Sequence, residues 1–177
     1  MTTGRLQVRL AEAEDREEVA RVLLDAYGQY EEALAGERWE QYKANILEAV
    51  DAPTTLARFV AEVDGRIVGS VFVYATSTEA YGAPQLQIHN PIIRLLGVTR
   101  EARGLGVATE LIRASAKLAR EGGADSLHLH TSDLMDSAVR LYERLGFERA
   151  YDKEFHNGNI LVKSYRLRLE ETALLEA

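Results

Sequence analysis

The chain has 177 residues, of which 46% are hydrophobic and 28% are charged, and its formal net charge is −7. These values are typical of one globular domain with a sizeable core, and the acidic balance disfavours nucleic acid, whose binding requires a basic surface. Without cysteine there is no disulfide, thiolate metal site or cysteine nucleophile, which favours a reducing cytoplasm. No apolar stretch approaches the roughly 20 residues that cross a bilayer, and the N-terminus lacks a signal-peptide core.

The spacing of apolar residues predicts strands and helices in succession. Strands are expected where apolar residues alternate with polar ones or run continuously, at residues 6–10, 56–63, 66–74, 92–98, 126–131, 147–155 and 160–169. Helices are expected where apolar residues recur every three or four positions, at residues 15–30, 39–50, 107 to the glycine pair 122–123, and 134–145. The acidic run 12–18 is expected to be a solvated helix start, and the tail after residue 170 is expected to fray.

Turn signals mark the ends of several of these elements. Pro53 ends the second helix, and Gly146 caps the last one. Asp64-Gly65 and Asn157-Gly158 are typical centres of two-residue hairpin loops. The stretch 75–90 lacks periodicity and carries glycine and proline, so a long loop or an extension of the strand is expected there.

The segment Arg103-Gly104-Leu105-Gly106-Val107-Ala108 follows an apolar strand and opens a helix. Glycine lets a ligand approach the backbone closely, because it has no Cβ. The first N–H groups of a helix have no partner within it, and the helix dipole adds partial positive charge there. Such an end binds phosphate or pyrophosphate, to which Arg103 can add a charge-assisted contact. The segment therefore predicts a ligand that carries phosphate.

Several kinds of loop are compatible with these residues, including a plain loop without a ligand. A P-loop ends in Gly-Lys-Ser/Thr, but no lysine follows until Lys117. A dinucleotide fingerprint requires a third small residue, where Thr109 stands, and an acid near the end of the next strand, whereas Asp125 precedes that strand. The remaining alternative is a loop that holds the pyrophosphate of coenzyme A.

A second motif lies roughly thirty residues further on, where residues 137–147 read Ser-Ala-Val-Arg-Leu-Tyr-Glu-Arg-Leu-Gly-Phe. With both motifs present in this order, the chain resembles the GNAT superfamily of N-acetyltransferases. The acetyl-CoA loop of that family reads Q/R-x-x-G-x-G/A and is matched by Arg103, Gly106 and Ala108. Its later helix reads A-x-x-L-Y-E-x-L-G-F, which the second motif matches. The resemblance covers residues 92–151 closely.

The resemblance implies an α/β (α+β) fold, with a mixed, mostly antiparallel, twisted sheet of about seven strands and helices on both faces. The order of the predicted elements, β-α-α-β-β-β-α-β-α-β-β, is that of the family. One GNAT domain is expected over residues 1–170, followed by a C-terminal tail at 171–177.

The resemblance further implies an acyl-CoA-dependent N-acyltransferase that moves acetyl from acetyl-CoA directly to a primary amine in a ternary complex. The acceptor would be a small molecule or a protein N-terminus, and no metal would take part. Nucleic acid and membranes are not expected partners, a homodimer is allowed, and the expected location is the cytoplasm. Two alternatives are a catalytically weak acyl-CoA-binding sensor of the same fold and a protein that uses the loop to bind a nucleotide.

The residues implied to bind acetyl-CoA lie on the strand before the loop, on the loop, and on the later helix. Backbone groups of the strand would pair with the pantetheine arm. On the helix, Met135 stands where the family often has Asn, so Ser137 is taken as a substitute. The positions are Leu96, Gly97, Val98, Arg103, Gly104, Leu105, Gly106, Val107, Ala108, Thr109 and Ser137.

Tyr142 matches the family tyrosine whose hydroxyl lies near the thioester sulfur and can protonate it. The alternative is that Tyr142 only packs, because tyrosine is a common core residue with a polar tip. Aromatic side chains of the first two helices would wall the acceptor site, where they either cradle a cation or anchor the core. The residues in question are Trp39, Tyr30 and Tyr42, with Glu31, Glu32 or Glu40 nearby.

The general base is less clearly marked. Many family members supply a carboxylate from the strand before the loop, but residues 92–98 contain no acid. His128 and His130 share one face of the next strand by alternation, and a histidine can move a proton near neutral pH. We predict that deprotonation runs through water that touches His130, which lies nearer the carboxyl end of its strand, where α/β sites open; a water chain could also serve without a single base. The alternative is a pair of structural histidines, and Glu79, Tyr81 and His89 are further candidates.

Overall fold

The computed structural model describes residues 5–28, 36–52, 55–131, 136–157 and 160–175. Within them the α-helices are α1 (Arg16–Tyr27), α2 (Glu37–Asp51), α3 (Ser77–Tyr81), α4 (Val107–Glu121) and α5 (Asp136–Arg144). The strands are β1 (Leu6–Leu10), β2 (Ala57–Val63), β3 (Arg66–Tyr74), β4 (Ile92–Val98), β5 (Ser126–Thr131), β6 (Glu148–Arg149), β7 (Phe155–Asn157) and β8 (Ile160–Arg168).

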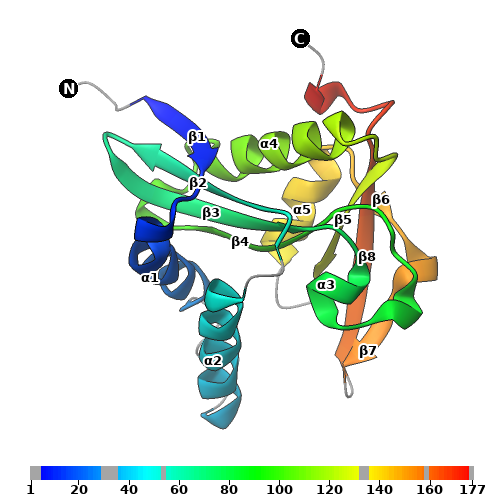
Figure 1. Ribbon diagram of the computed structural model, residues 1–177, viewed down its shortest axis with the longest axis horizontal. Coiled ribbons are helices and arrows are strands. Elements are labelled where there is room, and N and C mark those ends of the chain that lie inside the picture. The colour runs from blue at the N-terminus through cyan, green and yellow to red at the C-terminus, as the bar shows by residue number, and fades with distance from the viewer. Residues whose placement is uncertain (1–4, 29–35, 53–54, 132–135, 158–159, 176–177) are drawn as a thin grey trace. The chain divides into compact units, whose positions relative to one another are not determined.

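The strands form a mixed sheet in the order β1-β2-β3-β4-β5-β8-β6, and β7 pairs with β8 (Figure 1). The pair β4–β5 is parallel, whereas β8 runs antiparallel to β5, β6 and β7, and β1 runs antiparallel to β2. The predicted mixed, mostly antiparallel sheet is therefore confirmed, with eight strands among the described residues rather than about seven.

The chain forms two compact units. The first comprises Met1–Phe72 and Leu95–Ala114, and the second comprises Val73–Arg94 and Ser115–Ala177. The chain passes from one unit to the other within β3, β4 and α4. The single domain over residues 1–170 remains a prediction.

In the first unit, helices cover both faces of β3 (Figure 1). The guanidinium of Arg58 lies 4.6 Å from the ring centroid of Phe72 and donates to carbonyls at the end of α2. Gly69 points to the opposite face, because side chains alternate along a strand. A Cβ at Gly69 would lie 2.7 Å from Cγ1 of Val107, the first residue of α4. Glycine at this position therefore allows α4 to pack directly on the strand.

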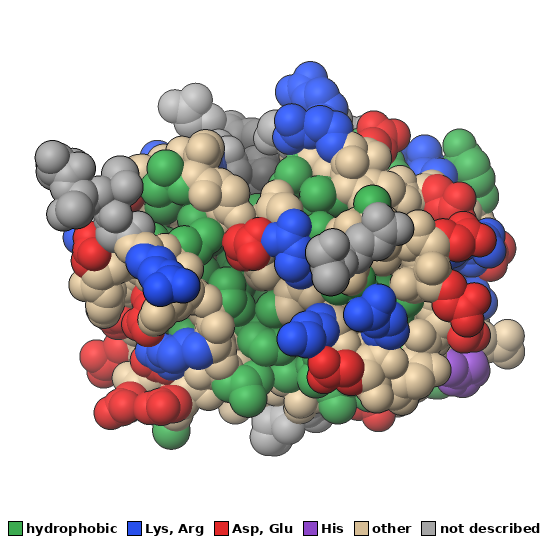
Figure 2. Space-filling model, turned by 90° about the horizontal axis from the view of Figure 1, so that it is seen from above, with side chains coloured by type: hydrophobic (Ala, Val, Ile, Leu, Met, Phe, Trp, Pro, Cys, Tyr) green, Lys and Arg blue, Asp and Glu red, His purple; other side chains and the backbone are tan. Residues whose placement is uncertain are grey.

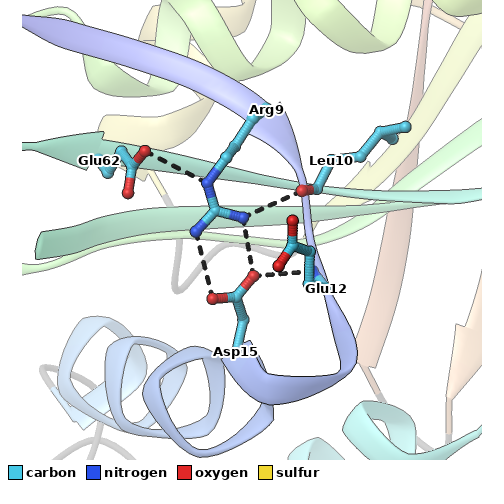
Figure 3. Close-up of polar contacts among 5 residues, drawn as sticks. All are labelled: Arg9, Leu10, Glu12, Asp15 and Glu62. Carbon is cyan, nitrogen blue, oxygen red and sulfur yellow. Dashed lines mark hydrogen bonds and ion pairs between the residues drawn. The ribbon is translucent and has the colours of Figure 1, made fainter. Parts of the chain in front are cut away.

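An ion-pair network joins β1, β2 and the start of α1 (Figure 3). The Arg9 guanidinium lies 2.8 Å from Asp15 and 3.2 Å from Glu62, and it also donates to the Leu10 carbonyl. The backbone N–H of Glu12 donates to the Asp15 carboxylate at 2.7 Å. The expectation of a solvated acidic run is wrong for Asp15, which is buried and whose pKa the hydrogen bond from Arg9 lowers.

The second unit has two distinct sheet faces. In the β5–β8 ladder His130 lies opposite Ser164, and in the β7–β8 ladder Phe155 lies opposite Val162. Because opposite residues share a face and side chains alternate, His128, His130 and Phe155 lie on one face. Leu167 lies on the other, where its side chain is 3.6 Å from a Cβ built at Gly146, just after α5. The helix α5 and the two histidines therefore belong to opposite faces.

Three local expectations are wrong. The stretch 75–90 is not a plain loop, because it contains α3 and a 3-10 turn at Pro84–Leu86. The predicted strand 147–155 is interrupted by a 3-10 turn at Tyr151–Lys153. The tail does not fray immediately after residue 170, because Leu174 is buried in a further 3-10 turn.

The turn predictions fare better. Asp64 and Gly65 have φ of 53° and 80°, as the two central residues of a type I′ hairpin turn require. Gly146 has φ of 100° and closes α5, as predicted. In the second hairpin Asn157 pairs with Ile160, while Gly158 lies outside the described residues.

Candidate active site

The glycine loop lies in the first unit, between a 3-10 turn at Arg100–Ala102 and the first turn of α4. Gly104 and Gly106 have φ of 83° and 79°, and a Cβ at either position would meet nothing within 4 Å. Glycine is thus required for the left-handed backbone rather than for lack of space. The open space beside both residues is where a ligand can approach the main chain.

The loop presents a row of unpaired backbone donors. In the part of the chain that the structure describes, no N–H group from Gly104 to Thr109 donates to another protein group. The carbonyl of Gly106 accepts the first bond of α4, from the N–H of Glu110 at 3.1 Å. Successive unpaired N–H groups at a helix N-terminus bind phosphate oxygens well. The structure therefore places Gly104, Leu105, Gly106, Val107, Ala108 and Thr109 together, as predicted, in a segment suited to an anion.

Two arginines fix the loop to the end of α1. Arg103 Nη2 donates to the carbonyl of Ala26 at 3.2 Å. The backbone N–H of Arg100 donates to the Asp25 carboxylate at 3.0 Å. Arg103 is predicted from the sequence as a phosphate contact, but its bond to α1 is not, since that bond joins residues 77 positions apart.

The backbone of β4 departs from regular strand geometry just before the predicted pantetheine positions. Leu95 has φ of 54°, which bends the strand at this point. The hydroxyl of Tyr27 donates to the carbonyl of Leu96 at 3.2 Å. A Cβ at Gly97 would lie 3.0 Å from Leu23 of α1. Leu96, Gly97 and Val98 are thus held against α1, in the same unit as the loop.

The aromatic residues predicted near the acceptor form a stack in the first unit. The ring of Tyr42 lies 5.8 Å from Tyr27 and 6.2 Å from Trp39, centroid to centroid. The ammonium of Lys43 lies 5.7 Å from the Trp39 ring centroid, so a cation of the protein itself already covers this aromatic face. Trp39 is buried, as the core alternative requires. Tyr30, Glu31 and Glu32 lie outside the described residues.

Tyr142 lies in the second unit, on α5, and is only 8% exposed. Its ring centroid is 5.9 Å from that of Phe147, so the packing expected from the motif is present. Ser137 lies on the first turn of α5, but its side chain and Met135 lie outside the described residues. The predicted roles of Tyr142 and Ser137 remain predictions.

His130 forms a hydrogen-bonded pair with Tyr81, 49 residues away in the sequence. The Tyr81 hydroxyl and His130 Nδ1 are 2.9 Å apart, and the two rings meet edge to face at 5.0 Å. Phe155 closes the group, with its ring 5.5 Å from His130 and 6.0 Å from Tyr81. From the sequence, Tyr81 is only one of three further candidates for the general base, in a stretch expected to be a loop.

Burial lowers the pKa of both strand histidines to about 4. For His128, the neighbouring charges of His130 and Arg166 lower the pKa further. For His130, the Lys153 backbone raises the pKa but does not overcome burial. The prediction of His130 assumed that its pKa is the ordinary histidine value near neutrality, which is wrong because the pKa is about 4. Both rings are neutral at neutral pH.

The other base candidates are on or near α3. The Thr76 hydroxyl donates to the Glu79 carboxylate, which lowers the pKa of Glu79. Thr76 is the N-cap residue of α3 and its side chain makes no cap bond to the backbone, but the Thr-x-x-Glu spacing is the sequence pattern of a capping box and predicts α3 in hindsight. His89 is exposed in the segment before β4.

A small cavity of about 160 Å³ lies elsewhere in the first unit, between the start of α1 and the end of α2. No predicted site residue lines it. Its walls are Ala11, Glu12, Ala13, Arg16, Val19, Val50 and Arg58.

Within the described ranges, no three His, Cys, Asp or Glu side chains are grouped to hold a metal ion. No helix among the described residues is long and apolar enough to span a bilayer. Figure 2 shows acidic and basic side chains interspersed on the face it draws, rather than gathered by sign.

Comparison with known proteins identifies the family. The model of the acetyltransferase (GNAT) family matches residues 16–147, a range that includes the loop and α5. The chain belongs to the GNAT acetyltransferase family. A probable N-acetyltransferase family 8 member 5 from Mus musculus is 32% identical over 123 residues, which are 66% of this chain and 52% of that protein. The chain thus spans about half the length of the curated relatives it matches.

Solved GNAT structures share the fold. An acetyltransferase of the GNAT family from Desulfovibrio desulfuricans aligns with a TM-score of 0.71 and 16% identity, covering 93% of this chain and 99% of that one. The PaiA N-acetyltransferase from Thermoplasma acidophilum, in complex with coenzyme A, aligns with a TM-score of 0.68 and 14% identity, covering 92% and 99%. The predicted GNAT fold is therefore confirmed.

Proposed function

We propose that this GNAT protein is an N-acetyltransferase that transfers acetyl from acetyl-CoA to an amine-bearing acceptor through a ternary complex. The observation that carries the proposal is the row of unpaired N–H groups from Gly104 to Thr109, at the position of the family's acetyl-CoA loop. Those donors suit the pyrophosphate of coenzyme A. Coenzyme A bound to a structural neighbour of the same fold supports this ligand.

The chemistry makes three demands of the protein. The acceptor amine must be neutral when it attacks, the developing oxyanion needs a donor, and the thiolate leaving group gains a proton. We assign the last step to Tyr142, whose hydroxyl would donate to the sulfur. The backbone of Leu96, Gly97 and Val98 would hold the pantetheine arm. Cytoplasmic location, a homodimer, and the choice between a small amine and a protein N-terminus as acceptor stay predictions.

The test is release of free coenzyme A, followed with a thiol reagent, from acetyl-CoA and a panel of primary amines. We expect amine-dependent release, because the acyl group leaves the thiol only when an acceptor takes it. Binding of acetyl-CoA without release for any amine would instead support the catalytically weak sensor, which no observation here favours. Stabilisation by ATP that acetyl-CoA does not displace would support the nucleotide alternative.

A further inference from the structure

The pair Tyr81–His130 is built from three segments of the second unit. Tyr81 ends α3, His130 lies near the end of β5, and Arg94 of β4 joins them. The Arg94 guanidinium lies 5.0 Å from the Tyr81 ring centroid and 5.7 Å from that of Tyr74. It also donates to the carbonyl of Ala80 at 2.8 Å. The ring of Tyr81 is therefore held by contacts with Arg94, His130 and Phe155.

The oxygen of Tyr81 can accept a further hydrogen bond. Burial raises the pKa of Tyr81 and lowers that of His130, so the phenol keeps its proton and the imidazole ring is neutral. Which group donates in the bond between them depends on the tautomer of the ring. With the ring hydrogen on Nε2, Nδ1 accepts from the hydroxyl, and with it on Nδ1, the ring donates to the Tyr81 oxygen. In both cases a lone pair of this oxygen is left for a further hydrogen bond.

This oxygen lies at the point where β4 and β5 separate. The parallel β4–β5 ladder ends at Ile93 opposite Leu129, although β5 continues to Thr131. Tyr81 belongs to the histidine face of the sheet, because its hydroxyl is bonded to His130.

The charges around His130 disfavour an additional cation. The groups that face it are Tyr81 from α3, Arg94 from β4, Glu154 before β7, and His128 on its own strand. Arg94 is a fixed positive charge, and both histidines are neutral. Glu154 is the one carboxylate among these groups.

The carboxylate of Glu154 already has an ion-pair partner and a hydrogen-bond donor. Glu154 forms an ion pair with Arg149 and accepts the backbone N–H of Ser164 at 3.2 Å. An ammonium group brought beside Tyr81 would therefore meet Arg94 without a free counter-charge among the facing groups.

We propose that Tyr81 is a further catalytic residue, whose hydroxyl oxygen accepts a hydrogen bond from the acceptor amine in its neutral form, and that His130 is a positioning residue that orients this hydroxyl. The proposal rests on the N-acetyltransferase function proposed above. It also assigns the class of acceptor, since an α-amino group is neutral near physiological pH far more often than an ε-amino group.

The step balances without an external base. The nitrogen of the neutral amine forms a bond to the acyl carbon, the carbon–sulfur bond breaks, and its electron pair goes to sulfur. The sulfur takes a proton from the Tyr142 hydroxyl, and the proton that the nitrogen loses restores that hydroxyl. No group has to hold a proton at the end of the reaction, which agrees with histidines that remain neutral.

The experiment measures coenzyme A release with two probes, alanyl-alanine amide for the α-amino class and Nα-acetyl-lysine amide for the ε-amino class. Near neutral pH we expect a kcat/KM about 10²-fold higher for the α-amine, from the difference in neutral fraction, and a gap that narrows as the pH rises. Tyr81→Phe should lower kcat/KM for the α-amine about tenfold and leave stabilisation by acetyl-CoA unchanged. Tyr151→Phe, at a tyrosine that is 72% exposed, is the matched control and should behave as wild type.

Two variants at His130 separate positioning from base catalysis. Asn can donate or accept a hydrogen bond with the Tyr81 hydroxyl but cannot take up a proton, whereas Leu can neither form the bond nor take up a proton. We expect His130→Asn to retain most activity and His130→Leu to resemble Tyr81→Phe, with acetyl-CoA stabilisation as the check on folding. The proposal would be overturned by any of three results: an equal loss of kcat/KM in both His130 variants, a wild-type kcat/KM in Tyr81→Phe, or a higher kcat/KM for the ε-amine than for the α-amine. No release by the wild-type protein from either probe or from the wider amine panel would overturn the proposed function itself.

Discussion

The glycine loop and the histidine face of β5 are two candidate regions built on different principles. The loop offers main-chain N–H groups at a helix start, and Gly104 and Gly106 serve it by their backbone conformation. The β5 face offers side chains that are buried, neutral and held by partners far away in the sequence. A backbone site depends on a short local motif, whereas a side-chain site depends on the register of the whole sheet.

The difference also separates binding from chemistry. Backbone donors provide a fixed field for a charged ligand and do not titrate. Buried side chains change their pKa with their surroundings, so their identity alone does not reveal their protonation state. The role of the loop can therefore be tested through ligand affinity, and that of the side-chain groups through turnover and pH dependence.

The largest effect is expected at Tyr142. Tyr142→Phe removes the hydroxyl that would protonate the thiolate but keeps the ring that packs on Phe147. The loss of a positioned general acid lowers kcat by about 10²- to 10⁴-fold, while folding and stabilisation by acetyl-CoA stay unchanged. Steady-state kinetics with an identified acceptor provide the measurement, and an unaltered kcat would reduce Tyr142 to a packing residue.

Acid stability tests the side-chain region next. The pKa of His128 is about 4 in the folded protein and about 6.5 in an unfolded chain. Between these values the unfolded chain binds a proton that the folded one does not, so stability is full above the higher value and falls as the pH drops through the window. The contribution of His128 is on the order of 3 kcal/mol. In urea unfolding, the free energy of unfolding of His128→Leu should decrease less between about pH 6.5 and about pH 4 than that of the wild type. An equally large decrease would contradict burial of a neutral His128 ring.

The exposed His89 provides the control for that measurement. His89→Gln changes a histidine that does not pack in the interior, so the steep acid dependence should remain. A shallower fall in this variant would show that the acid sensitivity arises from another part of the chain.

The loop is tested by a pair of glycine substitutions with equal backbone cost. Gly106 and Gly65 have φ of 79° and 80°, and neither has a neighbour within 4 Å of an added Cβ. Both Ala variants should lose about 1 kcal/mol of stability from the left-handed conformation. Only Gly106→Ala should also lose the roughly 2.7 kcal/mol that acetyl-CoA adds at about 100 times its Kd. Thermal unfolding of both variants with and without acetyl-CoA measures the difference. Equal stabilisation by acetyl-CoA in both variants would show that the loop is not part of the binding site.

The smallest effect is expected at Tyr27. Tyr27→Phe removes the hydrogen bond to the Leu96 carbonyl and should lower the free energy of unfolding by about 1 kcal/mol. Urea unfolding measures the difference, with Tyr151→Phe as an exposed control. A cost no larger than that of the control would mean that the carbonyl finds an equivalent donor elsewhere.

Much of the fold was predictable because its signals are local. Apolar periodicity placed the main helices and most strands, Asp64-Gly65 set a hairpin turn, and Gly106 marked the helix start. The 3-10 turns and α3 were not predicted, because they are short and lack a full apolar period. The Thr76-x-x-Glu79 spacing was present in the sequence but lay inside an aperiodic stretch.

The side-chain region was predictable only in part, for a physical reason. Alternation placed His128 and His130 on one face of a strand, but not the depth of their burial. Burial depends on segments such as α3 and β7 that pack on the strand. The shift of the His130 pKa away from neutrality arises from those distant contacts and cannot be read from the residues beside it.

Arg103, at the first position of the loop motif, also has a structural role. The family accepts either Gln or Arg there, two residues that differ in charge but both carry side-chain N–H donors of similar reach. In this chain that donor caps a carbonyl at the end of α1. The first residue of the motif in this chain therefore holds the ligand loop against the end of α1, in addition to standing beside the place for a ligand.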